Sequence, residues 1–234
     1  MVYCMFDPPN AGKGTYGLRL SNLFGIPFLS TGKLLRDKLE EEEMWFEGRY
    51  SQEMMDAGEM APADLVNKLV RDALENSDWD CVLDGFPRLE EQVGPFLEMV
   101  GREKEFIVIS LEQPTEVLLN RAEKRMVCTD CGRAYAIDNP NMQPREDGFC
   151  IDCGGEVVRR NDDSREVLRH RMDVYEERTE PVKEALLPRA EMFVAFSPKG
   201  DDVDAQSRRL HSAFVLSGSV SYTMHMSDDI EITF

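Results

Sequence analysis

At residues 2–15 the sequence reads VYCMFDPPNAGKGT, and this stretch decides the fold class. The apolar run at residues 2–6 has the length and composition of a buried strand. The prolines that follow favour a turn, and residues 13–23 have the pattern of a helix. A strand, a glycine-containing loop and a helix in this order are the setting in which backbone N–H groups at a helix N-terminus bind phosphate.

The loop departs in two places from the standard phosphate-loop pattern, G-x-x-x-x-G-K-[ST]. Asp7 stands where the pattern has glycine, and Thr15 comes one position late. Asp7 brings a carboxylate beside any bound polyanion, whereas Asn10 tolerates a positive φ. Taken alone, the loop is therefore either an ordinary turn or a phosphate cradle. In a cradle, Lys13 would reach the β and γ phosphates and Thr15 would face magnesium.

Strands and helices alternate through most of the remaining sequence. Further strands are predicted at residues 27–29, 81–83, 105–111 and 192–196, and further helices at residues 62–74, 114–126, 163–187 and 202–211. This order predicts an α/β fold with a mostly parallel, five-stranded sheet covered by helices on both faces. Ligands bind beyond the carboxyl ends of the strands in such sheets, where residues 8–15 and 84–88 both fall.

The last part of the sequence has a different pattern. Residues 219–226 and 230–234 alternate apolar and polar side chains around a Ser-Asp-Asp turn. This alternation predicts a β-hairpin, which would either extend the edge of the sheet or contact another subunit.

Four of the six cysteines form two C-x2-C pairs separated by 18 residues, Cys128 with Cys131 and Cys150 with Cys153. This spacing is typical of a zinc ribbon. We expect thiolates rather than disulfides, because the sequence after Met1 lacks the features of a secretory signal. Four such ligands would make a structural site that folds a segment with little core of its own. Two disulfides, or a ribbon that binds nucleic acid or protein, are the alternatives.

The charge and the apolar pattern exclude some classes of partner. The net charge of −18 argues against general affinity for nucleic acid. The longest apolar runs are strand-sized, which predicts no membrane span, and we expect a cytoplasmic protein. Arginines outnumber lysines nineteen to eight. This bias indicates either bidentate phosphate contacts or adaptation of the whole protein to a salty cytoplasm.

Several motifs, in order and at similar spacing, resemble those of adenylate kinases. Residues 8–15 are similar to the family's G-x-P-G-A-G-K-G-T loop. The later blocks that resemble the family are Ser30-Thr31-Gly32 with Leu35-Arg36, Asp56-Ala57-Gly58, and Leu83-Asp84-Gly85-Phe86-Pro87-Arg88 with Gln92. The likeness implies a nucleoside-monophosphate-kinase fold with two inserted subdomains. The kinase domain would cover residues 1–212 and be followed by an extension at residues 213–234. Within the domain, the core would comprise residues 1–29, 62–126 and 163–212. The NMP-binding subdomain would comprise residues 30–61 and the zinc lid residues 127–162.

The resemblance also implies the residues of two nucleotide sites. ATP would contact Asn10, Ala11, Gly12, Lys13, Gly14, Thr15, Arg121, Arg125, Ala134 and Tyr135. AMP would contact Thr31, Arg36, Glu59, Met60, Ala61, Gly85, Phe86, Pro87, Arg88, Gln92, Arg160 and Arg171. The catalytic groups would be Lys13, Arg88, Arg121, Arg125, Arg160 and Arg171. Asp84 would hold Mg²⁺ through water, and the four cysteines would hold Zn²⁺.

Phosphoryl transfer depends on alignment and on positive charge around the moving group. Arg121 and Arg125, four residues apart on the helix expected at 114–126, would reach the phosphates from one face. Gln92 offers an amide donor and acceptor to the edge of a base. Tyr135 would either lie on the adenosine or be a surface aromatic.

One further departure from the family concerns Lys33, which stands where the family has aspartate. Because Asp7 adds a carboxylate nearby, one hypothesis is that Asp7 and Lys33 form a compensating ion pair.

The sequence thus predicts a monomeric enzyme that transfers phosphate reversibly from Mg-ATP to AMP, giving two ADP. Two alternatives stay open. The acceptor could be another nucleoside monophosphate. The protein could also be a nucleotide-binding pseudoenzyme whose zinc lid is an interaction module, and the unusual residues Asp7, Asn10 and Lys33 favour this alternative.

Overall fold

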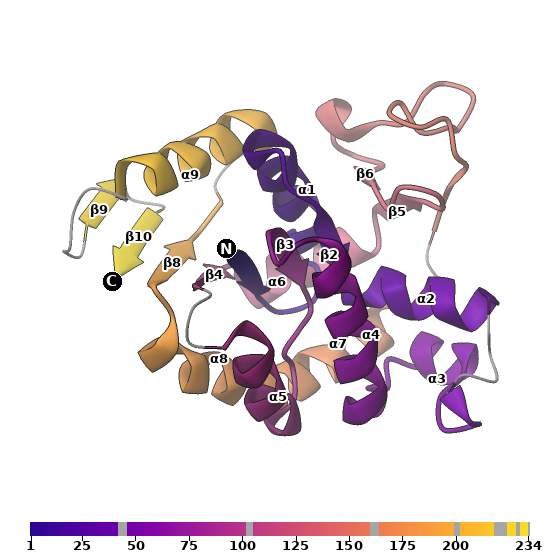
Figure 1. The fold of residues 1–234 in the computed structure, drawn as a ribbon. Helices are drawn as coiled ribbons and strands as arrows, with labels where there is room; N and C mark the ends of the chain where they lie inside the picture. Colours follow the sequence, from indigo (N-terminus) through magenta and orange to yellow (C-terminus); the bar gives the residue numbers. More distant parts are fainter. Residues whose placement is uncertain are drawn as a thin grey trace.

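The computed structural model describes residues 1–41, 46–101, 105–159, 164–198, 202–217, 224–227 and 230–233 (Figure 1). Its central sheet has the strand order β2-β3-β1-β4-β8-β10-β9. The first five strands in that order are parallel, as the sequence predicted. Their bounds are β1 (Val2–Phe6), β2 (Phe28–Ser30), β3 (Cys81–Asp84), β4 (Phe106–Leu111) and β8 (Met192–Phe196).

The other two strands make the sheet seven-stranded rather than five-stranded. Strands β9 (Met224–Ser227) and β10 (Ile230–Thr233) form an antiparallel hairpin. Strand β10 pairs antiparallel with β8, so the hairpin extends one edge of the sheet. Ile230 and Ile232 are buried in the core, whereas Glu231 between them is exposed.

Helices cover both faces of the sheet and pack into two hydrophobic cores. The helices are α1 (Lys13–Phe24), α2 (Thr31–Glu41), α3 (Gln52–Asp56), α4 (Ala63–Asn76), α5 (Glu90–Val100), α6 (Thr115–Ala122), α7 (Arg165–Val174), α8 (Glu180–Leu186) and α9 (Val203–Ser217). One core contains Val2 and Cys4 with residues of α4, α5 and α8, and the other contains Met5 with residues of α1, α6 and α9. Successive strand residues therefore serve opposite faces. Among the residues described, no helix is both long and apolar enough to cross a membrane.

Helix α1 lies unusually close to the sheet, and this closeness fixes the loop that precedes it. A Cβ added at Gly17 would lie 2.5 Å from Phe28 and 2.8 Å from Met5. On its other side, the Tyr16 hydroxyl donates a buried hydrogen bond of 3.3 Å to Gln206 of α9. The N-terminus of α1 is thus held at the carboxyl end of β1.

Two predicted helices differ from the observed ones. The helix expected at residues 114–126 ends at Ala122, and Arg125 begins a strand instead. The helix expected at 163–187 consists of α7, a π-helical turn at Tyr175–Thr179, and α8.

The early end of α6 has a structural reason, because the chain enters a second, small sheet. This sheet contains β5 (Arg125–Cys128), β6 (Ala134–Ala136) and β7 (Val157–Val158), in the order β6-β5-β7. Its few buried side chains form a separate cluster. Figure 1 shows β5 and β6 of the small sheet projecting from the core at the upper right, with α2 below them in this view. We refer to residues 125–158 as the lid.

Candidate functional site

A cavity of about 890 Å³ lies between the loop before α1, the start of α2, and the lid. Its volume is in the range of known ligand pockets. The predicted site residues that line it are Asn10, Gly12, Lys13, Gly14, Thr15, Thr31, Arg36, Glu59, Met60, Ala61, Asp84, Gly85, Pro87, Arg88, Gln92, Arg121, Arg125, Ala134, Tyr135 and Arg171. Ala11 and Phe86, which were predicted to contact ATP and AMP, do not line it, and their side chains are buried in the hydrophobic cores. Arg160 lies outside the described residues.

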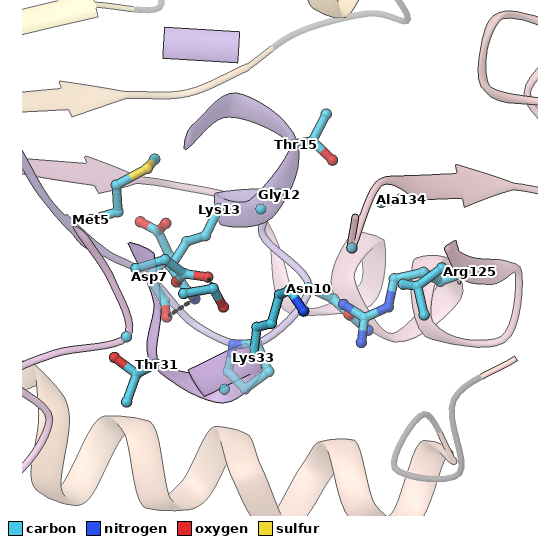
Figure 2. A pocket seen from close by; sticks show the side chains of 18 of the residues that line it. Met5, Asp7, Asn10, Gly12, Lys13, Thr15, Thr31, Lys33, Arg125 and Ala134 are labelled. Atoms are coloured by element: carbon cyan, nitrogen blue, oxygen red, sulfur yellow. Dashed lines mark hydrogen bonds between the residues drawn. The ribbon is translucent and has the colours of Figure 1, made fainter. Parts of the chain in front are cut away.

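The loop at the floor of the cavity has the backbone of an anion-binding turn. Asn10 has a φ of 64° and Gly12 a φ of 109°, and α1 begins at the next residue, Lys13. The Lys13 ammonium donates to the carbonyl oxygens of Asp7 at 2.7 Å and Pro8 at 3.1 Å (Figure 2). Burial lowers the pKa of Lys13, and the carboxylates of Asp7 and Asp84 oppose that shift. The cation is therefore held within the loop, at the N-terminus of α1, where an anion is favoured.

Asp7 faces the sheet rather than Lys33. Its Oδ1 accepts a hydrogen bond from the backbone N–H of Leu111 at the end of β4. Burial raises the pKa of Asp7 well above its ordinary value, while Lys13 and the Leu111 N–H act in the opposite direction. The Lys33 ammonium instead lies 2.9 and 3.0 Å from the carboxylate oxygens of Asp37, one turn along α2. The predicted ion pair between Asp7 and Lys33 is therefore wrong.

Buried polar atoms without a partner gather at this cavity. In the described part of the chain, seven buried side-chain atoms lack a hydrogen-bond partner. Five of the seven belong to residues that line the cavity: Asp7 Oδ2, Asn10 Oδ1 and Nδ2, Thr31 Oγ1, and Asp84 Oδ1. An unsatisfied buried polar atom costs free energy, so such groups normally have partners. Their concentration at this cavity indicates a binding site for a polar ligand.

Two side chains hold the backbone of Arg88, one at its N–H group and one at its carbonyl oxygen. Gln92 Oε1 accepts hydrogen bonds from the N–H groups of Arg88 at 2.7 Å and Leu89 at 3.1 Å, and the Thr179 hydroxyl donates to the Arg88 carbonyl at 3.2 Å. Gly85 has a φ of +87°, and a Cβ there would lie 2.7 Å from the Arg88 guanidinium. The side-chain oxygen of Gln92 is thus used within the protein, and the contact of its amide group with a base edge stays a prediction.

Guanidinium groups from separate segments converge on the cavity. Those that line it belong to Arg36 of α2, Arg88 before α5, Arg121 of α6, Arg125 of β5 and Arg171 of α7. Arg121 donates to the Ala11 carbonyl in the loop at 3.4 Å. Gly58 lets the stem of Arg171 approach, because an added Cβ would lie 2.9 Å from Arg171 Cγ. Arg121 and Arg125 do not share a helix as predicted, yet both line the cavity. Such a set of planar, forked donors suits a ligand with several phosphates.

Tyr135 is buried in the lid rather than exposed on its surface. Only 1% of the residue is exposed, and its hydroxyl donates to Cys150 Sγ at 3.1 Å and accepts from the Ile151 N–H at 3.0 Å. It borders the cavity, and it belongs to the small core of the lid together with Cys128, Cys150 and Val157. The alternative of a surface tyrosine is therefore wrong, and the contact of Tyr135 with ATP stays a prediction.

The four lid cysteines form a single cluster whose Sγ atoms all lie within 4.8 Å of one another. All four are free thiols, with Cys128 3.4 Å from Cys153 and Cys131 3.6 Å from Cys150. Tetrahedral thiolates bound at about 2.3 Å from a zinc ion would lie about 3.8 Å apart, so the cluster fits a metal ion and not two disulfides. Burial raises the pKa of the Cys150 thiol, but the hydrogen bond from Tyr135 and neighbouring N–H groups lower it to about 6.

Among the cavity residues that the sequence did not assign to the site are Tyr175 and Thr179. Both lie in the π-helical turn, four and eight residues after Arg171. The Tyr175 hydroxyl donates to Glu180 at 2.9 Å, and burial raises the pKa of Tyr175. Their spacing from Arg171 on a predicted helix is a signal that could have identified them.

Comparison with known proteins gives a consistent result. The family model described as adenylate kinase matches residues 5–187. An adenylate kinase of Thermotoga petrophila is 40% identical over 190 residues, which cover 78% of this chain and 84% of that protein. An adenylate kinase of Haloarcula marismortui is 38% identical over 177 residues (75% and 79%), and one of Methanosarcina acetivorans is 38% identical over 188 residues (78% and 84%). The extent of these matches shows that the chain belongs to the adenylate kinase family.

Proposed function

We propose that the protein transfers the terminal phosphate of ATP to AMP, reversibly, to give two molecules of ADP. Membership of the adenylate kinase family supports this reaction. The observation that carries it is the convergence of five guanidinium groups, from five segments, on one cavity beside the loop of residues 7–15. Phosphoryl transfer needs this arrangement, because its catalysis is mostly alignment and stabilisation of charge.

On the ATP side, the loop would supply most of the contacts. Backbone N–H groups between Asn10 and Thr15 would hold the phosphates, and Lys13 would exchange its carbonyl partners for phosphate oxygens. Arg121 and Arg125 would grip the same phosphates from α6 and β5. Movement of the lid towards the core would expel water that otherwise competes as the acceptor.

On the AMP side, Arg36 and Arg88 would each fork onto the α-phosphate, and the Thr31 hydroxyl, which has no partner among the described residues, would donate to it. The segment at residues 59–61 would face the base and ribose. Arg171, and Arg160 outside the described residues, would neutralise charge between the nucleotides. Magnesium bound with ATP would offset phosphate charge, and Asp84 Oδ1, buried at the end of β3, would hold it through water.

We further propose that the lid cysteines hold a structural Zn²⁺, supported by the spacing of their Sγ atoms. Metal analysis should give about one zinc per chain. A chelator should lower the thermal midpoint of unfolding, since the lid has few buried side chains of its own. Zinc, but not magnesium, should restore the midpoint. Purified reduced protein that lacks zinc and has the same midpoint with or without it would contradict this proposal.

The assay of ADP formation tests the main proposal. Purified protein with Mg-ATP should form ADP with AMP faster than with GMP, CMP or UMP. Replacing Arg88 by Lys should lower kcat/KM for AMP by about tenfold or more, because a point charge replaces a bidentate fork. Nucleotide binding without turnover would favour the pseudoenzyme, and a faster reaction with another monophosphate would favour the other kinase activity. One chain would supply both nucleotide sites, so the activity needs no second subunit.

A further inference from the structure

Lys33 lines the cavity, but it has no part in the nucleotide contacts proposed for ATP and AMP. We propose that it contacts the phosphate group that passes between the two nucleotides, an inference that rests on the proposed kinase activity. Lys33 lies in the first turn of α2 and lines the cavity. In Figure 2 its side chain extends from α2 toward Asn10 of the phosphate loop. The resemblance to the family would place a carboxylate at this position, so the charge at this point is reversed.

The start of α2 is itself suited to an anion. The helix has 11 residues and no acidic residue in its first turn. The side chain of Thr31 is buried, and its Oγ1 has no partner among the described residues. Arg36 folds back over the same turn, because its Nη1 lies 3.6 Å from the position of a Cβ at Gly32. A helix N-terminus, an unsatisfied hydroxyl and a guanidinium together favour a phosphate beside Lys33.

The present partner of Lys33 can be exchanged. Its ammonium contacts Asp37 at 2.9 Å, and the two side chains are 42% and 45% exposed. Such pairs, one helical turn apart and open to water, contribute little to stability. A polyanion in the cavity would therefore compete well with Asp37 for this lysine.

The location of Lys33 assigns it to the transferred group rather than to one nucleotide. It comes from α2, on the side proposed for AMP, and points toward the loop proposed for ATP (Figure 2). Arg125 of β5 points toward the loop tip from the lid side (Figure 2). Charge on the moving phosphoryl group spreads over its three equatorial oxygens in the transition state. The compact ammonium of Lys33 would stabilise that charge from the α2 side of the cavity. The other lysine of α2, Lys38, does not line the cavity.

The test compares Lys33→Met, Lys33→Arg and Lys33→Asp with the matched control Lys38→Met on the same helix. Lys33→Met should lower kcat by about tenfold or more with KM for ATP changed less than about twofold, the pattern of a contact made mainly in the transition state. Lys33→Asp should lose more activity than Lys33→Met, and Lys33→Arg should keep most of it. Lys38→Met should have the kcat of the wild type. Thermal midpoints should match throughout, because the side chain of Lys33 is partly exposed.

The outcomes separate this inference from the proposed function. A Lys33→Met protein with wild-type kcat, or a Lys33→Asp protein as fast as wild type, would overturn the inference and leave the kinase activity in place. A loss of kcat in Lys38→Met as large as in Lys33→Met would overturn it too, because the effect would then be one of general charge. Wild-type protein that forms no ADP would overturn the kinase activity and this inference with it.

Discussion

At the scale of single residues, the buried carboxyl group of Asp7 should make stability depend on pH. Burial raises its pKa in the folded state above the ordinary value of 3.8, so the folded state binds this proton more tightly than the unfolded state. The contribution of Asp7 to the free energy of unfolding therefore falls as the pH rises above that value toward the raised pKa. Asp7→Asn removes the titration and keeps an acceptor for the Leu111 N–H. Between about pH 5 and pH 8 the wild type should lose more stability than Asp7→Asn.

Chemical denaturation at several pH values measures this difference. Asp37→Asn is a suitable control. The side chain of Asp37 is partly exposed, and it forms an ion pair with Lys33 one turn away on α2. The control should follow the wild-type pH profile. Parallel profiles of wild type and Asp7→Asn would show that Asp7 does not titrate in this range.

Gly85 should be required for the position of Arg88. Alanine there would have a φ of +87° and a Cβ 2.7 Å from the Arg88 guanidinium. The strain costs about 1–2 kcal/mol, and the displaced arginine should lower kcat/KM for AMP by about tenfold or more. Gly94→Ala in α5 is the matched control, since a Cβ there meets nothing within 4 Å. The control should keep full activity, because Gly94 does not line the cavity. Equal activity of the two variants would mean that Arg88 does not act from its observed position.

Sequence reasoning identified residue types better than it identified side-chain directions. Arg88 and Arg171 were predicted from motif and order, and both line the cavity. Tyr135 and Gln92 were assigned to ligands, but the lid core and the start of α5 use their polar atoms. Such local hydrogen bonds depend on which groups the fold leaves unsatisfied, and a linear pattern does not give that information.

At the scale of elements, the C-terminal hairpin should contribute directly to stability. Ile232 of β10 is completely buried and pairs with Val194 of β8. Ile232→Ala should cost about 2–5 kcal/mol in urea denaturation, because it leaves a cavity in the core. Glu231→Ala changes the neighbouring exposed residue and should cost less than about 0.5 kcal/mol. Neither change should alter KM, since neither Glu231 nor Ile232 lines the cavity. Equal stability of the two variants would show that β10 is not packed on β8 in solution.

The limits of element prediction are clearest at the start of the lid. The apolar pattern favoured one helix over residues 114–126, but α6 ends at Ala122 and Arg125 pairs with Ala136 in the lid sheet. Helical periodicity indicates which side chains can face a core. It does not indicate that a strand elsewhere in the sequence will form hydrogen bonds with the same backbone and so end the helix. The central strands β1, β3 and β4 were predictable because each is a short, mostly apolar run that is buried along nearly its whole length.

At the scale of the whole molecule, the excess of acidic over basic residues should make the protein more stable in salt. The chain has 45 acidic and 27 basic residues, so many surface carboxylates have no cation to balance them. The resulting repulsion destabilises the compact state, and salt screens it because the Debye length falls from about 10 Å at 0.1 M to about 3 Å at 1 M. The thermal midpoint should therefore rise from about 50 mM to about 1 M NaCl.

The same salt should act in the opposite direction on binding. The cavity gathers its arginines for a polyanion, and chloride screens that attraction, so KM for ATP should rise while the thermal midpoint also rises. A variant with Glu75, Glu91 and Glu98 changed to Gln tests the origin of the first effect, because these exposed changes raise the net charge from −18 to −15. Its midpoint should depend less steeply on NaCl than that of the wild type, with KM for ATP unchanged at each salt concentration. A wild-type midpoint that falls as salt is added would mean that local ion pairs such as Arg49 with Asp64 outweigh the repulsion among the acidic residues.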